Sequence, residues 1–148
     1  RIDSAALGRL LKPAAKADTF IRDTFRDLYF SEEDNTFLDH LRYRLKHDLP
    51  AGHLRSLGHA AAARACIQKR PRGLFTFTGL GKGQDGRRDH EIALRDHFIR
   101  ALDDLTAAVF DNGRECRADH LDVFALPTDA ADVVYLDPPY VSRYSDCD

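Results

Sequence analysis

The chain has 148 residues, of which 43% are hydrophobic and 31% are charged, so it is long enough to bury a core and has an ordinary globular composition. No apolar stretch approaches the roughly 20 residues that a membrane-spanning helix needs. The chain begins with Arg1, contains no Met and shows no secretion signal, so we expect a piece of a longer protein. Its three widely spaced cysteines predict reduced thiols rather than a disulfide framework or a zinc site: Cys66, Cys116 and Cys147.

The net charge of −2 hides three segments of different sign. Residues 1–63 hold 10 basic and 9 acidic side chains, residues 64–102 hold 9 and 4, and residues 103–148 hold 3 and 11. A basic middle segment favours contact with a polyanion, although ordinary solvated charge explains the same pattern. On charge alone the function stays open.

The first 110 residues or so have the patterns of helices. Residues 1–18 carry little periodicity and are interpreted as a linker with a helical turn or two. Apolar residues at helical spacing then predict four helical segments: 19–29, 31–49, 52–68 and 92–109. Ser31, with Asp34 three residues later, resembles a capping box, and Pro50 marks the end of that helix. Gly113 is placed to end the last helix in a left-handed conformation.

Three short apolar stretches predict strands: Leu74–Thr78, Leu121–Leu126 and Val133–Leu136. The last two are typical of buried strands in a parallel sheet, so the helical body is expected to lead into an α/β sheet. The glycine-rich stretch Gly79–Arg88 lacks the spacing of a dinucleotide loop and of a P-loop. It is either a basic loop that contacts nucleic acid, a cofactor loop or an idle surface loop.

A tetrapeptide follows the last predicted strand: Asp137, Pro138, Pro139 and Tyr140. The two prolines stop the strand and fix the backbone at the carboxyl edge of the sheet, where open α/β folds bind ligands. The carboxylate of Asp137 and the carbonyl of Pro138 can accept both hydrogens of an amino group, and Tyr140 can stack on a flat ring. This arrangement suits a planar base that carries an exocyclic amine, although a rigid turn at a strand end explains part of the pattern.

With this tetrapeptide, the chain resembles the Dam-like adenine-specific DNA methyltransferases, which use S-adenosylmethionine. The resemblance runs from about Asp18 to the end and rests on stretches that include Phe20-Ile21-Arg22, Leu28 to Asp34, Lys69 to Gly73, Arg87-Arg88-Asp89 and Phe110 to Arg114. It implies an α/β fold in which a mostly helical DNA-recognition insertion, residues 19–113, precedes a partial Rossmann-like methyltransferase sheet, residues 114–148.

The resemblance also implies a reaction: direct transfer of a methyl group to the N6 amino group of an adenine flipped out of double-stranded DNA. The tetrapeptide Asp137, Pro138, Pro139 and Tyr140 would be catalytic. Asp119 resembles the acidic residue that the family places near the cofactor, so Asp119 and Asp137 are candidate ligands of S-adenosylmethionine. Six basic residues would neutralise DNA phosphates: Lys69, Arg70, Arg72, Lys82, Arg87 and Arg88. No metal site is expected.

Two departures from the family qualify this interpretation. The family's Phe-x-Gly-x-Gly cofactor loop has no counterpart before Asp18, and Ala118-Asp119 stands where the family usually has Gly-Asp. We therefore expect a fragment that is inactive alone and needs the missing flanking parts of its catalytic core. Its expected location is the cytoplasm of a prokaryote, with a prokaryotic or phage gene. The alternatives are a non-catalytic DNA-binding module and a cytosine N4 methyltransferase, with a glutamine methyltransferase third.

Overall fold

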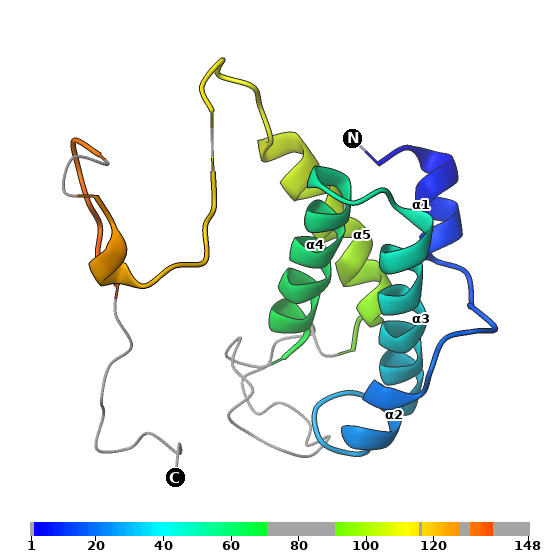
Figure 1. The fold of residues 1–148 in the computed structure, drawn as a ribbon. Coiled ribbons are helices and arrows are strands. Elements are labelled where there is room, and N and C mark those ends of the chain that lie inside the picture. The colour runs from blue at the N-terminus through cyan, green and yellow to red at the C-terminus, as the bar shows by residue number, and fades with distance from the viewer. Residues whose placement is uncertain (1, 71–90, 116, 128–130, 138–148) are drawn as a thin grey trace, which may run out of the picture. The chain divides into compact units, whose positions relative to one another are not determined.

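The computed structural model describes residues 2–70, 91–115, 117–127 and 131–137. The chain divides into two compact units, residues 1–111 and residues 112–148. The α-helices of the described residues all belong to the first unit (Figure 1). They are α1 (Ser4–Leu10), α2 (Phe20–Thr24), α3 (Glu32–Asp48), α4 (His53–Lys69) and α5 (Leu94–Ala108). Helix α3 packs against each of the other four, and α4 and α5 form the most extensive pair.

Helix α3 begins at a side-chain cap, as its sequence predicts. The Ser31 hydroxyl accepts a hydrogen bond from the backbone N–H of Asp34 at 3.2 Å. The reciprocal half of a capping box is absent, because the Asp34 carboxylate bonds groups in the interior instead. Acidic side chains fill the first turn and basic ones the last, so both ends complement the helix dipole. The helix ends at Asp48, two residues before Pro50.

Small residues bring α4 close to its neighbours. Gly58, Ala61 and Ala65 are all buried on α4. A Cβ atom built on Gly58 would stand 2.3 Å from Cδ2 of Leu45, so only glycine fits at this contact between α3 and α4. The rest of the core comes from larger side chains, of which Phe98 is fully buried. The chain therefore folds its first unit around an ordinary helical core.

The first residues belong to this core, which corrects their interpretation as a linker. The helical turn expected there is α1, whose N-terminus is capped by the Asp3 carboxylate. Ile2, Ala6 and Leu10 join the hydrophobic cluster of the unit, and Leu10 is only 1% exposed. The apolar residues recur every four positions, and this places them on one face of a two-turn helix. That pattern is too short to stand out in sequence.

The last helix ends earlier than its sequence suggests. Gly113 has the expected left-handed backbone, with φ of 71°. Helix α5 nevertheless stops at Ala108, and the extended residue Val109 is its C-cap. The prediction of a helix over residues 92–109 is confirmed, whereas its termination by Gly113 is wrong.

The strands expected in the second unit are not formed in the residues that the structure describes. Residues 123–125 make a 3-10 helix, η2, which the Asp122 carboxylate caps through the N–H of Phe124. Residues 133–136 have no regular structure. A strand needs a neighbour to bond its N–H and C=O groups, and no described segment pairs with either stretch. The apolar side chains are consequently exposed, by 94% at Phe124 and 85% at Val133.

Between residues 2 and 137, the regular structure of the described residues is thus helical and includes no sheet. The remaining predicted strand, Leu74–Thr78, and the glycine-rich stretch Gly79–Arg88 lie within residues 71–90, outside the described residues. No helix in the described part is long and apolar enough to cross a membrane.

Candidate nucleic-acid interface

Lys69, one of the six cations expected to contact phosphate, is a buried residue. Its ammonium group lies 2.9 Å from Oδ2 of Asp34 and donates a hydrogen bond to the Ile92 carbonyl at 2.6 Å. The whole residue is 9% exposed. A charge held in this way cannot reach a phosphate without leaving its partners, so phosphate binding by Lys69 stays a prediction that this pairing opposes. Sequence reasoning did not anticipate the pairing, because lysines are almost always exposed unless paired.

Asp34 connects three helix ends. Asp34 lies in the first turn of α3. Its Oδ1 accepts a hydrogen bond from the N–H of Leu94, the first residue of α5, at 2.9 Å. Its other oxygen pairs with Lys69, the last residue of α4. A carboxylate at two helix N-termini and an ammonium at a helix C-terminus each complement a helix dipole. Helix α5 has no side-chain cap of its own, so Asp34 supplies one from 60 positions away.

Arg70, the residue that follows the last residue of α4, is also bound to another part of the unit. Its Nη1 donates to the Tyr29 carbonyl at 2.9 Å, and its guanidinium lies 5.8 Å from the centre of the Tyr29 ring. The side chain is half-buried. Arg70 therefore holds the connection between α2 and α3 against the end of α4, and that structural role competes with phosphate binding.

The other predicted site residues are not brought together by the described residues. Asp119 lies in the second unit and pairs with Arg117, whose Nε is 2.6 Å from its Oδ2. Asp137 is exposed in the same unit. The remaining candidates lie outside the described residues: Arg72, Lys82, Arg87, Arg88, Pro138, Pro139 and Tyr140.

A surface that sequence analysis did not single out lies over α3. Arg44 donates hydrogen bonds to the carbonyls of Lys12 and Pro13, at 3.4 and 2.7 Å. His40 accepts the N–H of Ala14 on its Nδ1 at 3.3 Å. The segment after α1 is therefore tied along the outer side of α3. No sequence pattern predicts these contacts, because the partners are about 30 positions apart and have no periodic relation.

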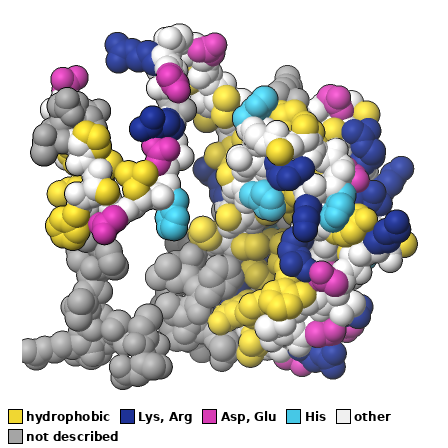
Figure 2. All heavy atoms as spheres, in the orientation of Figure 1, with side chains coloured by type: hydrophobic (Ala, Val, Ile, Leu, Met, Phe, Trp, Pro, Cys, Tyr) yellow, Lys and Arg dark blue, Asp and Glu magenta, His cyan; other side chains and the backbone are white. Residues whose placement is uncertain are grey.

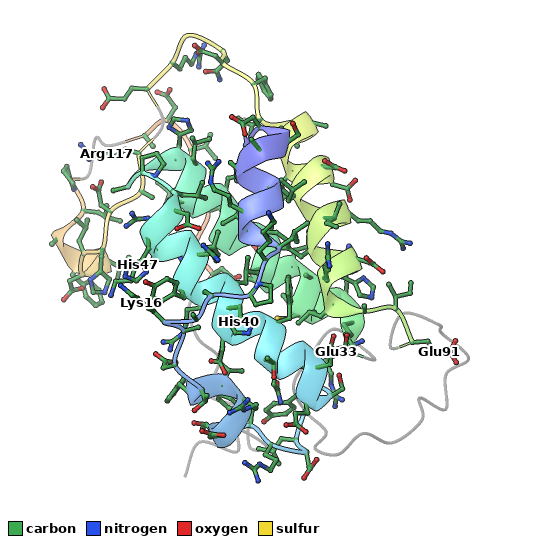
Figure 3. All side chains as sticks on the ribbon, turned by 90° about the vertical axis from the view of Figure 1, so that its right-hand side faces the viewer. Lys16, Glu33, His40, His47, Glu91 and Arg117 are labelled. Carbon is green, nitrogen blue, oxygen red and sulfur yellow. The ribbon has the colours of Figure 1, made fainter. Side chains whose placement is uncertain are left out.

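We call this surface the α3 basic ridge, and it consists of Lys12, Lys16, His40, Arg44, Lys46 and His47. Lys16, His40 and His47 lie along the same side of α3 (Figure 3). On the face that Figure 2 shows, Lys and Arg side chains gather on the side of the first unit formed by α1 and α3. The ridge thus combines basic side chains of α3 with those of the segment that is bound to it.

Two cavities of the first unit contain none of the predicted site residues. The smaller, of about 390 Å³, is apolar except for one amide and is lined by Ile21, Phe25, Tyr29, Phe30, Asn35 and Leu38. The larger, of about 570 Å³, is lined by His53, Leu57, Asp103, Thr106, Ala107 and Val109. No group of three or more possible metal ligands occurs within the described ranges.

Comparison with known proteins gives one informative match. The chain is 32% identical over 134 residues to the type II methyltransferase M2.HphI of Haemophilus parahaemolyticus. The chain is a distant homologue of a type II methyltransferase. The match covers 82% of this chain and 40% of the relative, so the chain spans well under half of that protein. No family model and no solved structure matches the chain.

The homology suggests S-adenosylmethionine as a cofactor, and the described residues do not by themselves form a pocket for it. Asp119 has one carboxylate oxygen bound to Arg117, and Asp137 is exposed. Neither residue lines either of the two cavities above. A bound nucleoside needs a concave and largely apolar wall around its polar contacts. Residues 117–127 and 131–137 provide no such wall.

Proposed function

We propose that the chain is part of a DNA methyltransferase that modifies the N6 amino group of adenine in double-stranded DNA with S-adenosylmethionine as methyl donor. The observation that carries the proposal is the 134-residue match to a type II methyltransferase. The tetrapeptide from Asp137 to Tyr140 adds a base-binding chemistry that fits such an activity. The first residue of the tetrapeptide favours adenine as the substrate base. Enzymes that methylate cytosine N4 more often begin this motif with serine, whereas this chain has Asp137.

The roles proposed for the tetrapeptide are binding and orientation of the base. Asp137 and the Pro138 carbonyl accept the two amino hydrogens, and this draws the amino lone pair out of conjugation with the ring. Pro138 and Pro139 restrict the backbone so that these acceptors stay fixed. Tyr140 stacks on the flipped base and offsets part of the few kcal/mol lost on unstacking.

The exposed apolar residues of the second unit support a requirement for further catalytic-core elements. Leu121, Val123 and Leu126 are each about half exposed, and Val133 to Leu136 are more so. Contiguous apolar surface of this kind marks a site that another element covers. We therefore propose that residues 121–136 become strands only against the remaining parts of a methyltransferase sheet, and that the chain alone is inactive.

The test is to express the coding sequence that contains these residues in a bacterial host without adenine methylation and to measure methylated nucleosides in its DNA by mass spectrometry. N6-methyladenine is expected from the parent and should disappear in Asp137→Ala. Asp132→Ala is the matched control, since it removes an exposed acid of the same unit. N4-methylcytosine instead would establish the cytosine alternative. The absence of both methylated nucleosides would contradict the enzyme proposal.

A second candidate is a non-catalytic DNA-binding module. It is favoured by the first unit, which has a complete hydrophobic core of its own, whereas the described part of the second unit has no buried residue. Duplex binding by the parent, with no methylated nucleoside in the assay above, would favour this module over the enzyme.

A further inference from the structure

We propose that the α3 basic ridge binds the phosphate backbone of double-stranded DNA. This inference rests on the proposed function, which supplies DNA as the partner. It assigns the contact to a surface other than residues 69–88, on which sequence reasoning placed it.

The ridge carries positive charge that its surroundings do not balance. Lys12, Lys16 and Lys46 are exposed, and none of them makes an ion pair with any described residue. The arginine of the ridge, Arg44, does form an ion pair, because its Nη1 lies 2.9 Å from Oδ2 of Asp48. Three lysines therefore remain available for a polyanion, which gains affinity by releasing the counterions of each neutralised phosphate.

Two other parts of the first unit's surface carry exposed acids beside or in place of exposed cations. On α5 the exposed cations Arg95 and Arg100 stand among exposed acids at 96, 103 and 104. The connection from α2 into α3 carries exposed acids at positions 23, 27, 32 and 33. These regions would repel a duplex or be neutral toward it. Helix α4 carries no acid, but its Arg64 pairs with Asp104 and its Arg55 donates to the Leu49 carbonyl, so both cations already have partners in the protein.

The ridge is also ordered before any ligand arrives. The bonds from Arg44 and His40 fix the chain between Lys12 and Lys16, so binding needs little further ordering of backbone. His47 is held too, because its ring stacks on Tyr43 with centroids 4.0 Å apart and its Nδ1 lies 2.8 Å from the Tyr43 carbonyl.

The experiment measures the affinity of the whole chain for a labelled duplex of mixed sequence by fluorescence anisotropy across a range of salt concentrations. The ridge variant is Lys12→Ala/Lys16→Ala/Lys46→Ala. A second variant replaces the same lysines with arginine and should retain binding. The control variant removes the same charge elsewhere, by Arg64→Ala/Arg95→Ala/Arg100→Ala. Circular dichroism checks that each variant keeps its helices.

We expect the slope of log K against log salt to fall in magnitude by about 2.7 in the ridge variant, which corresponds to three lost phosphate contacts. Between about 50 and about 200 mM salt the parent should then lose roughly 40-fold more affinity than the ridge variant. A slope equal to the parent's, or an equal change in the control variant, overturns this inference and leaves the proposed function intact. Failure of the parent to bind any duplex also overturns this inference, and the nucleoside assay above decides the proposed function separately.

Discussion

Asp34 and Lys69 form an ion pair at 2.9 Å inside the helical unit, with side chains 7% and 11% exposed. Neither charge is left without further partners, since Asp34 accepts the Leu94 N–H and Lys69 donates to the Ile92 carbonyl. The pair joins the start of α3, the end of α4 and the start of α5. It therefore contributes to the arrangement of the helices as well as to their stability.

The first prediction concerns removal of one partner. Asp34→Ala leaves the Lys69 ammonium buried without a counter-charge and the start of α5 without its cap. We expect the free energy of unfolding to fall by about 3 to 5 kcal/mol, measured by urea denaturation. Asp104→Ala is the control, because its pair with Arg64 is 3.7 Å long and exposed, and such pairs contribute at most about 1 kcal/mol. Equal losses in the two variants would contradict the role given to Asp34.

The second prediction concerns Asp39, which is 3% exposed and caps α2 from outside that helix. Its two oxygens accept the N–H groups of Ile21 and Arg22, at 2.8 and 3.0 Å. In Asp39→Ala we expect faster hydrogen exchange of the peptide covering residues 20–24 and a loss of about 1.5 to 3 kcal/mol in stability. Asp23→Ala changes an exposed acid within α2 and should leave the protection of residues 21 and 22 nearly unaltered.

A third prediction contrasts two helical glycines. Gly58→Ala would place a methyl group 2.3 Å from the buried Leu45 side chain, so the contact between α3 and α4 must open. Overpacking of this kind costs about 1 to 3 kcal/mol, which outweighs the gain in helix propensity. Gly8→Ala meets no atom within 4 Å and should raise stability by up to about 1 kcal/mol. Opposite shifts in the midpoint of thermal unfolding are expected, and a stabilising Gly58→Ala would contradict the packing described.

The fourth prediction follows from the partly buried thiol of Cys66. Burial and the nearby Asp34 carboxylate raise the pKa of Cys66 from 9.0 to about 11. A raised folded-state pKa means that the unfolded chain ionises first, so this thiol's contribution to stability is present below about pH 9 and is lost as the pH rises toward 11. In Cys116→Ser/Cys147→Ser, iodoacetamide should label Cys66 slowly at pH 8 and rapidly in denaturant. Rapid labelling of the native form would disprove the burial.

The sequence predicts the longer helices of the first unit well, because each has a local signal, whereas the short helix α1 lies in the segment interpreted as a linker. Ser31 caps α3, Pro50 follows its end, and apolar spacing defines α5. The predicted strands had only local apolarity to support them. Strand formation depends on partners distant in sequence, and residues 121–126 find none in the described residues.

The site was less predictable than the fold, for a related reason. A count of basic residues treats Lys69 and Lys12 alike, yet one is buried in an ion pair and the other is exposed. Only the tertiary arrangement separates structural cations from those available to a ligand. The tetrapeptide at Asp137 is different, since its residues are contiguous and its chemistry can be inferred locally, and its catalytic role stays a prediction.

The contact between Lys69 and the Ile92 carbonyl brings two chain positions 23 residues apart to one place. The end of α4 and the residue that leads into α5 are thus held together by groups of the helical unit itself, and Asp34 fixes the first residue of α5 beside them. One end of the α4 and α5 pair is therefore positioned by polar contacts of defined geometry, and the apolar packing along the rest of the pair only has to be compatible with it.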